Sequence, residues 1–391
     1  MTPAARVQAA IDVLAEWQDA DQGLDRVLAK WSLAHRFSGS KDRAAIADHV
    51  YGAVRRMRSA GWVSGSDDPT PRDILRGNLL LDGKDPAELF TGVSYAPSSL
   101  SESEQSRRPL DDAPRAVRLD YPDWIEPMMT DLPDQALDAM RDRAALDLRV
   151  NVLKTDVRAA GASLASDGVQ TIPHHLAKQA LRVTEGARKV TQSKAYETGL
   201  VEIQDAASQA VVELAATKPG ETVLDLCAGG GGKTLALAAA MANTGRLMAY
   251  DISQRRLAQL APRADRAGAK VTMLTPVRLK DQYGACDLVL VDAPCSGSGA
   301  WRRNPDAKWR LTPDALDELT RAQQSLLRQA ANLTSENGRI AYITCSMFQV
   351  ENTQVVEGFL QSQGRFRLAQ SRHFTPLDGA DGFYVAVLQD A

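Results

Sequence analysis

The sequence predicts an α/β protein whose C-terminal half folds into a doubly wound, largely parallel sheet. Residues 221–241, ETVLDLCAGGGGKTLALAAAM, read as a buried strand, a glycine loop and a helix. A second strand, GRLMAYD, ends in Asp251, about 20 residues beyond the loop. Two later apolar runs end in DAPCSG and TCS. Ligands of such sheets gather at the carboxyl ends of the strands, so we expect these segments to share one crevice.

The region before this sheet divides into three parts. Residues 1–90 predict a small helical domain, with helices over 5–19, 24–31, 41–57 and 71–81. Residues 91–119 are rich in Ser, Pro and charged residues, which predicts a flexible linker. Residues 120–199 begin with a helical segment and continue with the alternation typical of a compact α/β subdomain. Residues 200–391 then form the doubly wound domain.

The glycine loop indicates a nucleoside cofactor. Gly229, Gly230, Gly231 and Gly232 allow a tight turn that brings backbone N–H groups and a helix N-terminus close to a ligand. A phosphate-binding P-loop would need Gly at position 227, which is Cys227, and the GxGxxG pattern fails at Thr234. The Asp251 carboxylate suits the hydroxyls of a ribose. The alternatives are an ordinary tight turn for the loop and a helix N-terminal acid for Asp251.

Two cysteines, Cys295 and Cys345, each follow a strand-like apolar run. A thiolate attacks carbon, and two thiols in one pocket suit a reaction with separate attack and release steps. The alternative is that both are small buried core residues, as most cysteines outside disulfides are.

Further motifs show a resemblance to a known family. CAGGGGK at Cys227–Lys233, DAPCSG at Asp292–Gly297, WRRNPDAKWR at Trp301–Arg310 and TCS at Thr344–Ser346 resemble the RsmB-type members of the Nop/Sun family of RNA cytosine-5 methyltransferases. LRVNVLKTDV from Leu148, VEIQDAASQ from Val201 and DGFYVAVL from Asp381 extend the resemblance over most of residues 120–391. It implies a Rossmann-like class I methyltransferase domain that binds S-adenosylmethionine, preceded by a small RRM-like subdomain. RFSGSKDRAAIADHVYGAVRR, from Arg36, is similar to the NusB-like all-α N-terminal domain of this family.

The resemblance also implies roles for individual residues. Cys345 would attack carbon 6 of cytosine, Cys295 would help to resolve the adduct, and Asp292 would hydrogen-bond the base edge. The expected cofactor-binding residues are Cys227, Ala228, Gly229, Gly230, Gly231, Gly232, Lys233, Asp251 and Asp292.

The basic segment after DAPCSG is a candidate RNA contact. It holds Arg302, Arg303, Lys308 and Arg310 interleaved with Trp301 and Trp309, a mixture suited to phosphate contacts and base stacking. The alternative is a solvated basic loop with two packing tryptophans.

Two positions depart from the family pattern. Position 230 is Gly where the family usually has Pro, so we expect a more mobile loop and weaker cofactor binding. The family also carries an acid on the adenine side of the cofactor, whereas this chain has Thr275, Pro276 and Val277 there. Asp281 lies a few residues too late, so the adenine contact has no assigned residue.

Composition limits the remaining classes. The 391 residues carry a net charge of −3, which gives no global support for nucleic-acid binding, so local patches must supply it. Four cysteines form no CxxC pair, which predicts neither a disulfide framework nor a metal site. No apolar run reaches the roughly 18 residues of a membrane span. We therefore expect a cytoplasmic protein, and we expect it to be a monomer. The resemblance implies that it uses S-adenosylmethionine on RNA, with ribosomal RNA as the substrate because the N-terminal helical domain is similar to that of the rRNA-directed members. The alternative from another class is a non-catalytic RNA-binding or ribosome-assembly factor that retains the fold.

Overall fold

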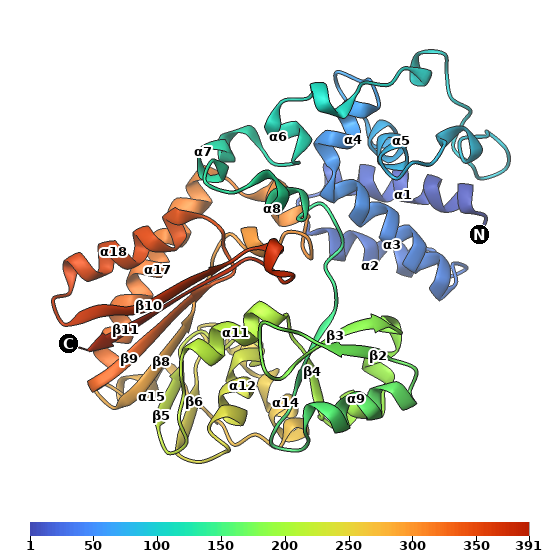
Figure 1. Ribbon diagram of the computed structural model, residues 1–391. Helices are drawn as coiled ribbons and strands as arrows, with labels where there is room; N and C mark the ends of the chain where they lie inside the picture. The colour runs from blue at the N-terminus through green and yellow to red at the C-terminus, as the bar shows by residue number, and fades with distance from the viewer. Residues whose placement is uncertain (391) are drawn as a thin grey trace. The chain divides into compact units, whose positions relative to one another are not determined.

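The computed structural model describes residues 1–390 and forms two compact units (Figure 1). The helical unit contains Met1–Arg143 together with Trp301–Leu311. The sheet unit contains Ala144–Ala300 together with residues 312–390. The chain therefore leaves the sheet unit after Ala300 and returns to it at Thr312. No helix within residues 1–390 is long and apolar enough to cross a membrane.

Five helices form the core of the helical unit: α1 (Pro3–Asp19), α2 (Leu24–Ala34), α3 (Ser40–Arg55), α4 (Met57–Val63) and α5 (Pro71–Leu81). Their apolar faces meet in one cluster that includes Leu14, Trp17, Val50 and Leu75. The predicted helix over 41–57 ends at Arg55, because Arg56 leaves the helical conformation before α4 begins. Gly77 of α5 lies so close to α4 that a Cβ there would be 1.8 Å from the carbonyl oxygen of Ala60.

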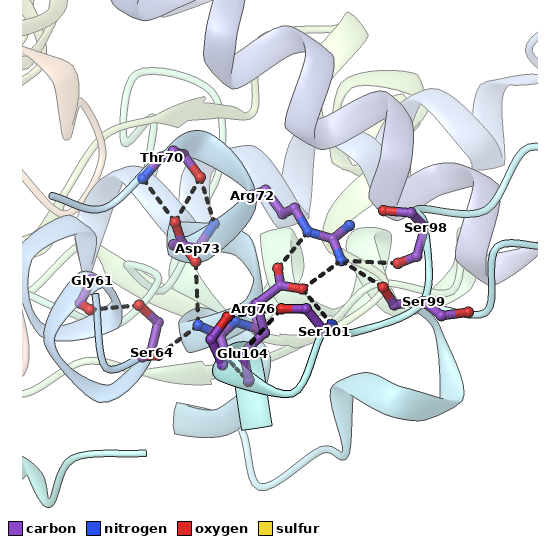
Figure 2. A network of polar contacts seen from close by, with 11 residues as sticks. Gly61, Ser64, Thr70, Arg72, Asp73, Arg76, Ser98, Ser99, Ser101 and Glu104 are labelled. Carbon is purple, nitrogen blue, oxygen red and sulfur yellow. Dashed lines mark hydrogen bonds and ion pairs between the residues drawn. The ribbon is translucent and has the colours of Figure 1, made fainter. Parts of the chain in front are cut away.

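Residues 91–119 are held against α5, although their composition predicted a flexible linker. Arg72 donates to both carboxylate oxygens of Glu104, at 2.6 and 3.2 Å, and to the carbonyl of Ser98 at 2.9 Å (Figure 2). The buried Arg76 donates to the carbonyls of Glu104 and Ser64. The hydrogen bond from Arg72 lowers the pKa of Glu104 to about 2. Arginines of α5 thus satisfy the polar groups that made this segment resemble a linker.

Short helices complete the helical unit. They are η1 (Pro86–Glu88), η2 (Ser103–Gln105), η3 (Leu110–Asp112), α6 (Arg115–Arg118), η4 (Asp123–Ile125), α7 (Glu126–Met129), α8 (Asp134–Asp138) and α16 (Asp306–Arg310).

The sheet unit begins with a four-stranded antiparallel sheet in the order β2-β3-β1-β4. Its strands are β1 (Asp147–Val150), β2 (Gln170–Pro173), β3 (Ala180–Glu185) and β4 (Val201–Ile203), and its helices are α9 (Val157–Ser166), η5 (Ala187–Gln192) and α10 (Lys194–Glu197). Leu148 and Val150 of β1 pack with Leu164 of α9. Because successive side chains of a strand alternate, Arg149 points away from this core, and its Nε donates to Gln204 at 2.7 Å.

The larger sheet has seven strands in the order β10-β11-β9-β8-β5-β6-β7. The strands are β5 (Thr222–Asp225), β6 (Arg246–Ala249), β7 (Thr272–Met273), β8 (Cys286–Asp292), β9 (Thr334–Thr344), β10 (Phe366–Phe374) and β11 (Phe383–Asp390). β5 to β9 are parallel, whereas β11 runs antiparallel to β9 and β10 antiparallel to β11. The strand order reverses between β5 and β8, which places a ligand crevice at their carboxyl ends.

Helices cover both faces of this sheet (Figure 1). α11 (Ala206–Leu214) and α12 (Gly232–Ala240) contribute to the core on one face, and α17 (Pro313–Leu333) and α18 (Thr353–Ser362) to the core on the other. The connections hold α13 (Gln254–Leu257), α14 (Leu260–Ala267), α15 (Pro276–Lys280), η6 (Ser298–Ala300), η7 (Gln349–Glu351) and η8 (Pro376–Asp378). The predicted doubly wound α/β fold is therefore confirmed.

Candidate active site

Cys295 and Cys345 meet at the carboxyl ends of two neighbouring strands. β8 and β9 are parallel, with Asp292 paired to Ile343, and each cysteine follows its strand by a few residues. Their Sγ atoms lie 3.4 Å apart. The structure thus brings together two thiols separated by 50 residues in the chain.

The surroundings of Cys295 favour its protonated form. The hydrogen bond with Cys345 raises the pKa of Cys295 well above its ordinary value, and burial and the charges of Cys345 and Glu351 add to this shift. Cys295 therefore keeps its proton near neutral pH. As a thiol it can donate that proton in a hydrogen bond to the sulfur of Cys345.

Asp292 forms an ion pair with Lys233, at 2.8 Å between Oδ2 and Nζ. Lys233 stands in the first turn of α12, directly after the glycine loop, so this pair joins the end of β8 to the loop that follows β5. Burial opposes the charged amine, but the charge of Asp292 and its hydrogen bond outweigh burial and raise the pKa of Lys233. Lys233 also lies 5.2 Å from the ring centre of Phe383. In the structure Lys233 therefore contacts the Asp292 carboxylate and the Phe383 ring.

Asp251 ties the glycine loop to the end of β6. Its Oδ2 accepts from Gly229 N at 2.8 Å and its Oδ1 from Ser253 N at 2.7 Å. Gly229 and Gly231 adopt backbone φ values of 54° and 87°, a region that residues other than glycine rarely occupy. Each oxygen of the buried Asp251 carboxylate keeps acceptor capacity for one further donor.

Gly230 is held through its carbonyl by a neighbouring side chain. Arg263 of α14 donates to that oxygen and also pairs with Glu202 of β4 at 3.0 Å. Glu202 is buried and pairs with Arg266 as well. Arg263 therefore braces the loop: it links Gly230, where the family usually has Pro, to Glu202 of the smaller sheet.

The edge of the sheet where the resemblance places the adenine carries exposed apolar side chains. Thr275 caps α15, and its hydroxyl accepts from Arg278 N. Ile252, after β6, is 90% exposed and Val277, after β7, is 77% exposed. Since β6 and β7 are parallel neighbours, both residues follow strand ends at the same edge of the sheet.

The Asp251 carboxylate has acceptor capacity that suits the hydroxyls of a ribose, and buried polar groups stand at the neighbouring end of β5. Asp225 accepts from the hydroxyl of Thr234 at 2.6 Å through Oδ2, while Oδ1 has no hydrogen-bond partner within residues 1–390. Burial raises the pKa of Asp225 to about 7, although the Thr234 hydrogen bond opposes the shift. Burial also raises the pKa of the Cys227 thiol, which therefore stays neutral. Ala228 is nearly buried, and its N–H donates to Tyr250 O at 2.9 Å.

The basic segment 301–311 packs within the helical unit. Lys308 is 5% exposed, donates to Arg55 O at 3.1 Å and lies 4.6 Å from the ring centre of Trp309. Burial lowers the pKa of Lys308 to about 8. Arg302 is also buried, whereas Arg303 and Arg310 are exposed, and Arg310 pairs with Asp21 at 3.0 Å. An RNA contact of these four cations remains a prediction.

Two residues beside the cysteines, Glu351 and Asn352, were not predicted from the sequence. Glu351 and Asn352 are fully buried and follow Cys345 by six and seven residues. Asn352 accepts from the hydroxyl of Thr344 and donates to the carbonyl of Ser346 at 2.9 Å, so it holds the TCS turn. The only signal in the sequence is an adjacent acid and amide shortly after a strand-end cysteine.

Comparisons with known proteins show which family the chain resembles. A family model described as 16S rRNA methyltransferase RsmB/F matches residues 212–389, and the ferredoxin-like domain model of RsmF/B-like methyltransferases matches residues 121–191. The probable ribosomal RNA small subunit methyltransferase B of Synechocystis sp. is 30% identical, with 95% of each chain covered. The ribosomal RNA small subunit methyltransferase B of Erwinia tasmaniensis is 29% identical, with 94% of each chain covered.

Solved structures show the same fold. A methyltransferase homolog protein from Pyrococcus horikoshii has a TM-score of 0.64 and 25% identity, covering 75% of this chain and all of that chain. PH0851 has a TM-score of 0.77 and 23% identity, covering all of this chain and 99% of that chain. Fold and strand-end site together define a Rossmann-like domain of the methyltransferase class. The chain belongs to the RsmB/F family of 16S rRNA methyltransferases, so the resemblance found in the sequence is confirmed.

Proposed function

We propose that the protein methylates carbon 5 of cytosine in ribosomal RNA with S-adenosylmethionine as the methyl donor. The observation that carries the proposal is the pair of thiols, Cys295 and Cys345, whose Sγ atoms lie 3.4 Å apart beside the Asp292–Lys233 ion pair. Family membership supports RNA methylation, since the relatives are named for the small-subunit ribosomal RNA.

The chemistry requires covalent activation of the base, because carbon 5 of cytosine is a poor nucleophile. The Cys345 thiolate adds to carbon 6, forming an Sγ–C6 bond and moving electron density to carbon 5. S-adenosylmethionine, when bound, supplies an electrophilic methyl group on its sulfonium. Release then requires transfer of the carbon 5 proton to a base. The C5–H electron pair re-forms the C5=C6 double bond, and the Sγ–C6 bond breaks with its electron pair returning to the Cys345 sulfur.

The arrangement favours Cys345 as the nucleophile and Cys295 as its helper. Cys295 keeps its proton because its pKa is raised by the hydrogen bond with Cys345, by burial and by nearby charge. A thiol in this position stabilises the neighbouring thiolate before attack and again when that thiolate is expelled. Asp292 would accept a hydrogen bond from the amino group of cytosine, and from the neighbouring ring nitrogen when that nitrogen is protonated, with Lys233 holding its carboxylate in place.

The cofactor would be held by residues Cys227, Ala228, Gly229, Gly230, Gly231, Gly232, Lys233, Asp251 and Asp292. Asp251 has acceptor capacity for a ribose hydroxyl, and Ile252 and Val277 offer apolar contact in place of the adenine-side acid. For RNA, Arg303 and Arg310 are the exposed cations of the basic segment, whereas Arg302 and Lys308 are buried within the helical unit.

The test is covalent trapping on RNA that contains 5-azacytidine, in the presence of S-adenosylmethionine, read on a denaturing gel. We expect wild type and Cys295→Ala to form an adduct and Cys345→Ala to form none. If wild type binds the cofactor but gives no adduct on ribosomal RNA or a precursor particle, the proposed substrate is wrong. If the cofactor does not bind either, the missing adenine-side acid favours the non-catalytic assembly factor.

A further inference from the structure

One buried carboxylate lies beneath both cysteine turns. Glu351, at the end of η7, has no exposed surface. Its Oε1 accepts from Ser296 N at 2.8 Å and from Gln323 Nε2 at 3.0 Å. Its Oε2 accepts from the hydroxyls of Ser296 and Ser346. Ser296 directly follows Cys295 and Ser346 directly follows Cys345, so a single side chain bonds both turns.

Further hydrogen bonds link the same two turns. The hydroxyls of Ser298 and Ser346 lie 3.0 Å apart, and the Ser298 hydroxyl accepts from Met347 N at 2.8 Å. Gly299 N donates to Cys345 O at 2.9 Å. Gln323 of α17 also donates to Pro294 O at 2.9 Å, which ties the turn before Cys295 to the same carboxylate.

The role of Glu351 is to accept hydrogen bonds and not merely to fill the core. A buried carboxylate is costly unless donors surround it, and apolar residues of similar volume fill a core at lower cost. Here four donors meet its two oxygens, and three of them come from the residues next to the cysteines. A glutamine could not accept from all four, because its NH2 group would face donors.

We propose that Glu351 is the positioning residue that sets the spacing of the two cysteines. By accepting hydrogen bonds from both turns it holds the Cys295 and Cys345 sulfurs within direct contact. The spacing itself is a property of the fold, whereas its consequence for attack and release rests on the proposed function.

Thiol oxidation tests the spacing without RNA or cofactor. Diamide takes two electrons and two protons from a pair of thiols, is reduced to the hydrazine, and leaves an Sγ–Sγ bond that peptide mapping identifies. We expect wild type and the control Glu357→Gln, whose side chain is exposed on α18, to form the Cys295–Cys345 disulfide at the same rate. Glu351→Gln should form it roughly tenfold more slowly or worse, because unpaired buried donors favour separated turns.

A second experiment measures the rate at which the covalent adduct with RNA forms. With 5-azacytidine RNA, Glu351→Gln should lower the rate of adduct formation at saturating RNA while leaving the KM for RNA near the wild-type value. Disulfide formation at the wild-type rate in Glu351→Gln overturns the positioning role, whatever the activity. Slow disulfide formation in Glu351→Gln, combined with no adduct in wild type, keeps the positioning role and rejects the proposed function.

A milder variant covers the case in which Glu351→Gln fails to fold. Ser346→Ala removes a single donor to Glu351 and leaves the carboxylate in place. Its disulfide should form several-fold more slowly than that of wild type, and an unchanged rate overturns the proposal.

Discussion

The brace between Arg263 and Gly230 gives a quantitative prediction about the cofactor loop. Arg263→Met removes the guanidinium but keeps most of the side-chain volume. The Gly230 carbonyl then loses its donor, while Glu202 retains its pair with Arg266, so no buried charge is left without a partner. The expected defect is therefore confined to the loop.

The magnitude follows from the hydrogen bond and its exposure. A hydrogen bond from a charged donor contributes about 1.5–3 kcal/mol, and the Arg263 side chain is 29% exposed, which places this one near the lower end. A loss of about 1.4 kcal/mol corresponds to a tenfold weaker equilibrium. We expect the dissociation constant for S-adenosylmethionine to rise about tenfold, because binding must now order a more mobile glycine.

The assay is calorimetric titration of S-adenosylmethionine into wild type, Arg263→Met, Gly230→Pro and the double variant. Pro restricts the backbone of the unbound loop, and we expect it to contribute to cofactor binding about the 0.4–1 kcal/mol that the same restriction of a flexible chain contributes to folding. If Arg263 compensates for the mobility of Gly230, Gly230→Pro should restore part of the affinity lost in Arg263→Met. The matched control is Arg255→Met, an exposed arginine on α13.

Two results would refute this reasoning. One is cofactor binding by Arg263→Met as tight as that of wild type, which would show that the carbonyl contact does not order the loop. Alternatively, the effects of Arg263→Met and Gly230→Pro could be additive, which would show that the two positions do not interact.

Two further predictions concern stability, measured by urea unfolding. Helix propensity alone predicts that Gly77→Ala stabilises α5 by about 1 kcal/mol, but its Cβ would lie 1.8 Å from Ala60 O, so we expect a loss of about 3 kcal/mol. Gly364→Ala, with nothing within 4 Å of its Cβ, is the control, and equal effects at both sites would contradict the packing argument. Asp225→Asn tests the carboxyl whose pKa burial raises from 3.8 to about 7. Because the unfolded chain ionises first, wild type loses stability as pH rises from about 4 to 7, so the variant should gain up to about 4 kcal/mol relative to wild type over that range, whereas a difference independent of pH would count against the shift.

The sequence by itself determined the class of fold and the composition of the site. The strand, glycine loop and helix of residues 221–241, and the cysteines after two apolar runs, are local patterns, because alternation and turn chemistry depend on near neighbours in the chain. Parallel strands place their carboxyl ends at one edge, so Cys295 and Cys345 could be expected in the same crevice. The family motifs surrounding them identified the class of enzyme.

Only the tertiary structure decided which side chains meet. Glu351 accepts a hydrogen bond from Ser296, 55 residues away in the chain. Lys233 after β5 forms an ion pair with Asp292 at the end of β8, and the order of elements along the chain does not show that these two strands are neighbours. The composition of residues 91–119 predicted a flexible linker, yet arginines of α5 donate to carbonyls of this segment and to the Glu104 carboxylate. The basic segment 301–311 follows the DAPCSG turn in the chain but packs within the helical unit. The physical reason is common to all four: composition and periodicity report what a segment can bury, whereas its partners depend on the order of strands and on donors from distant segments.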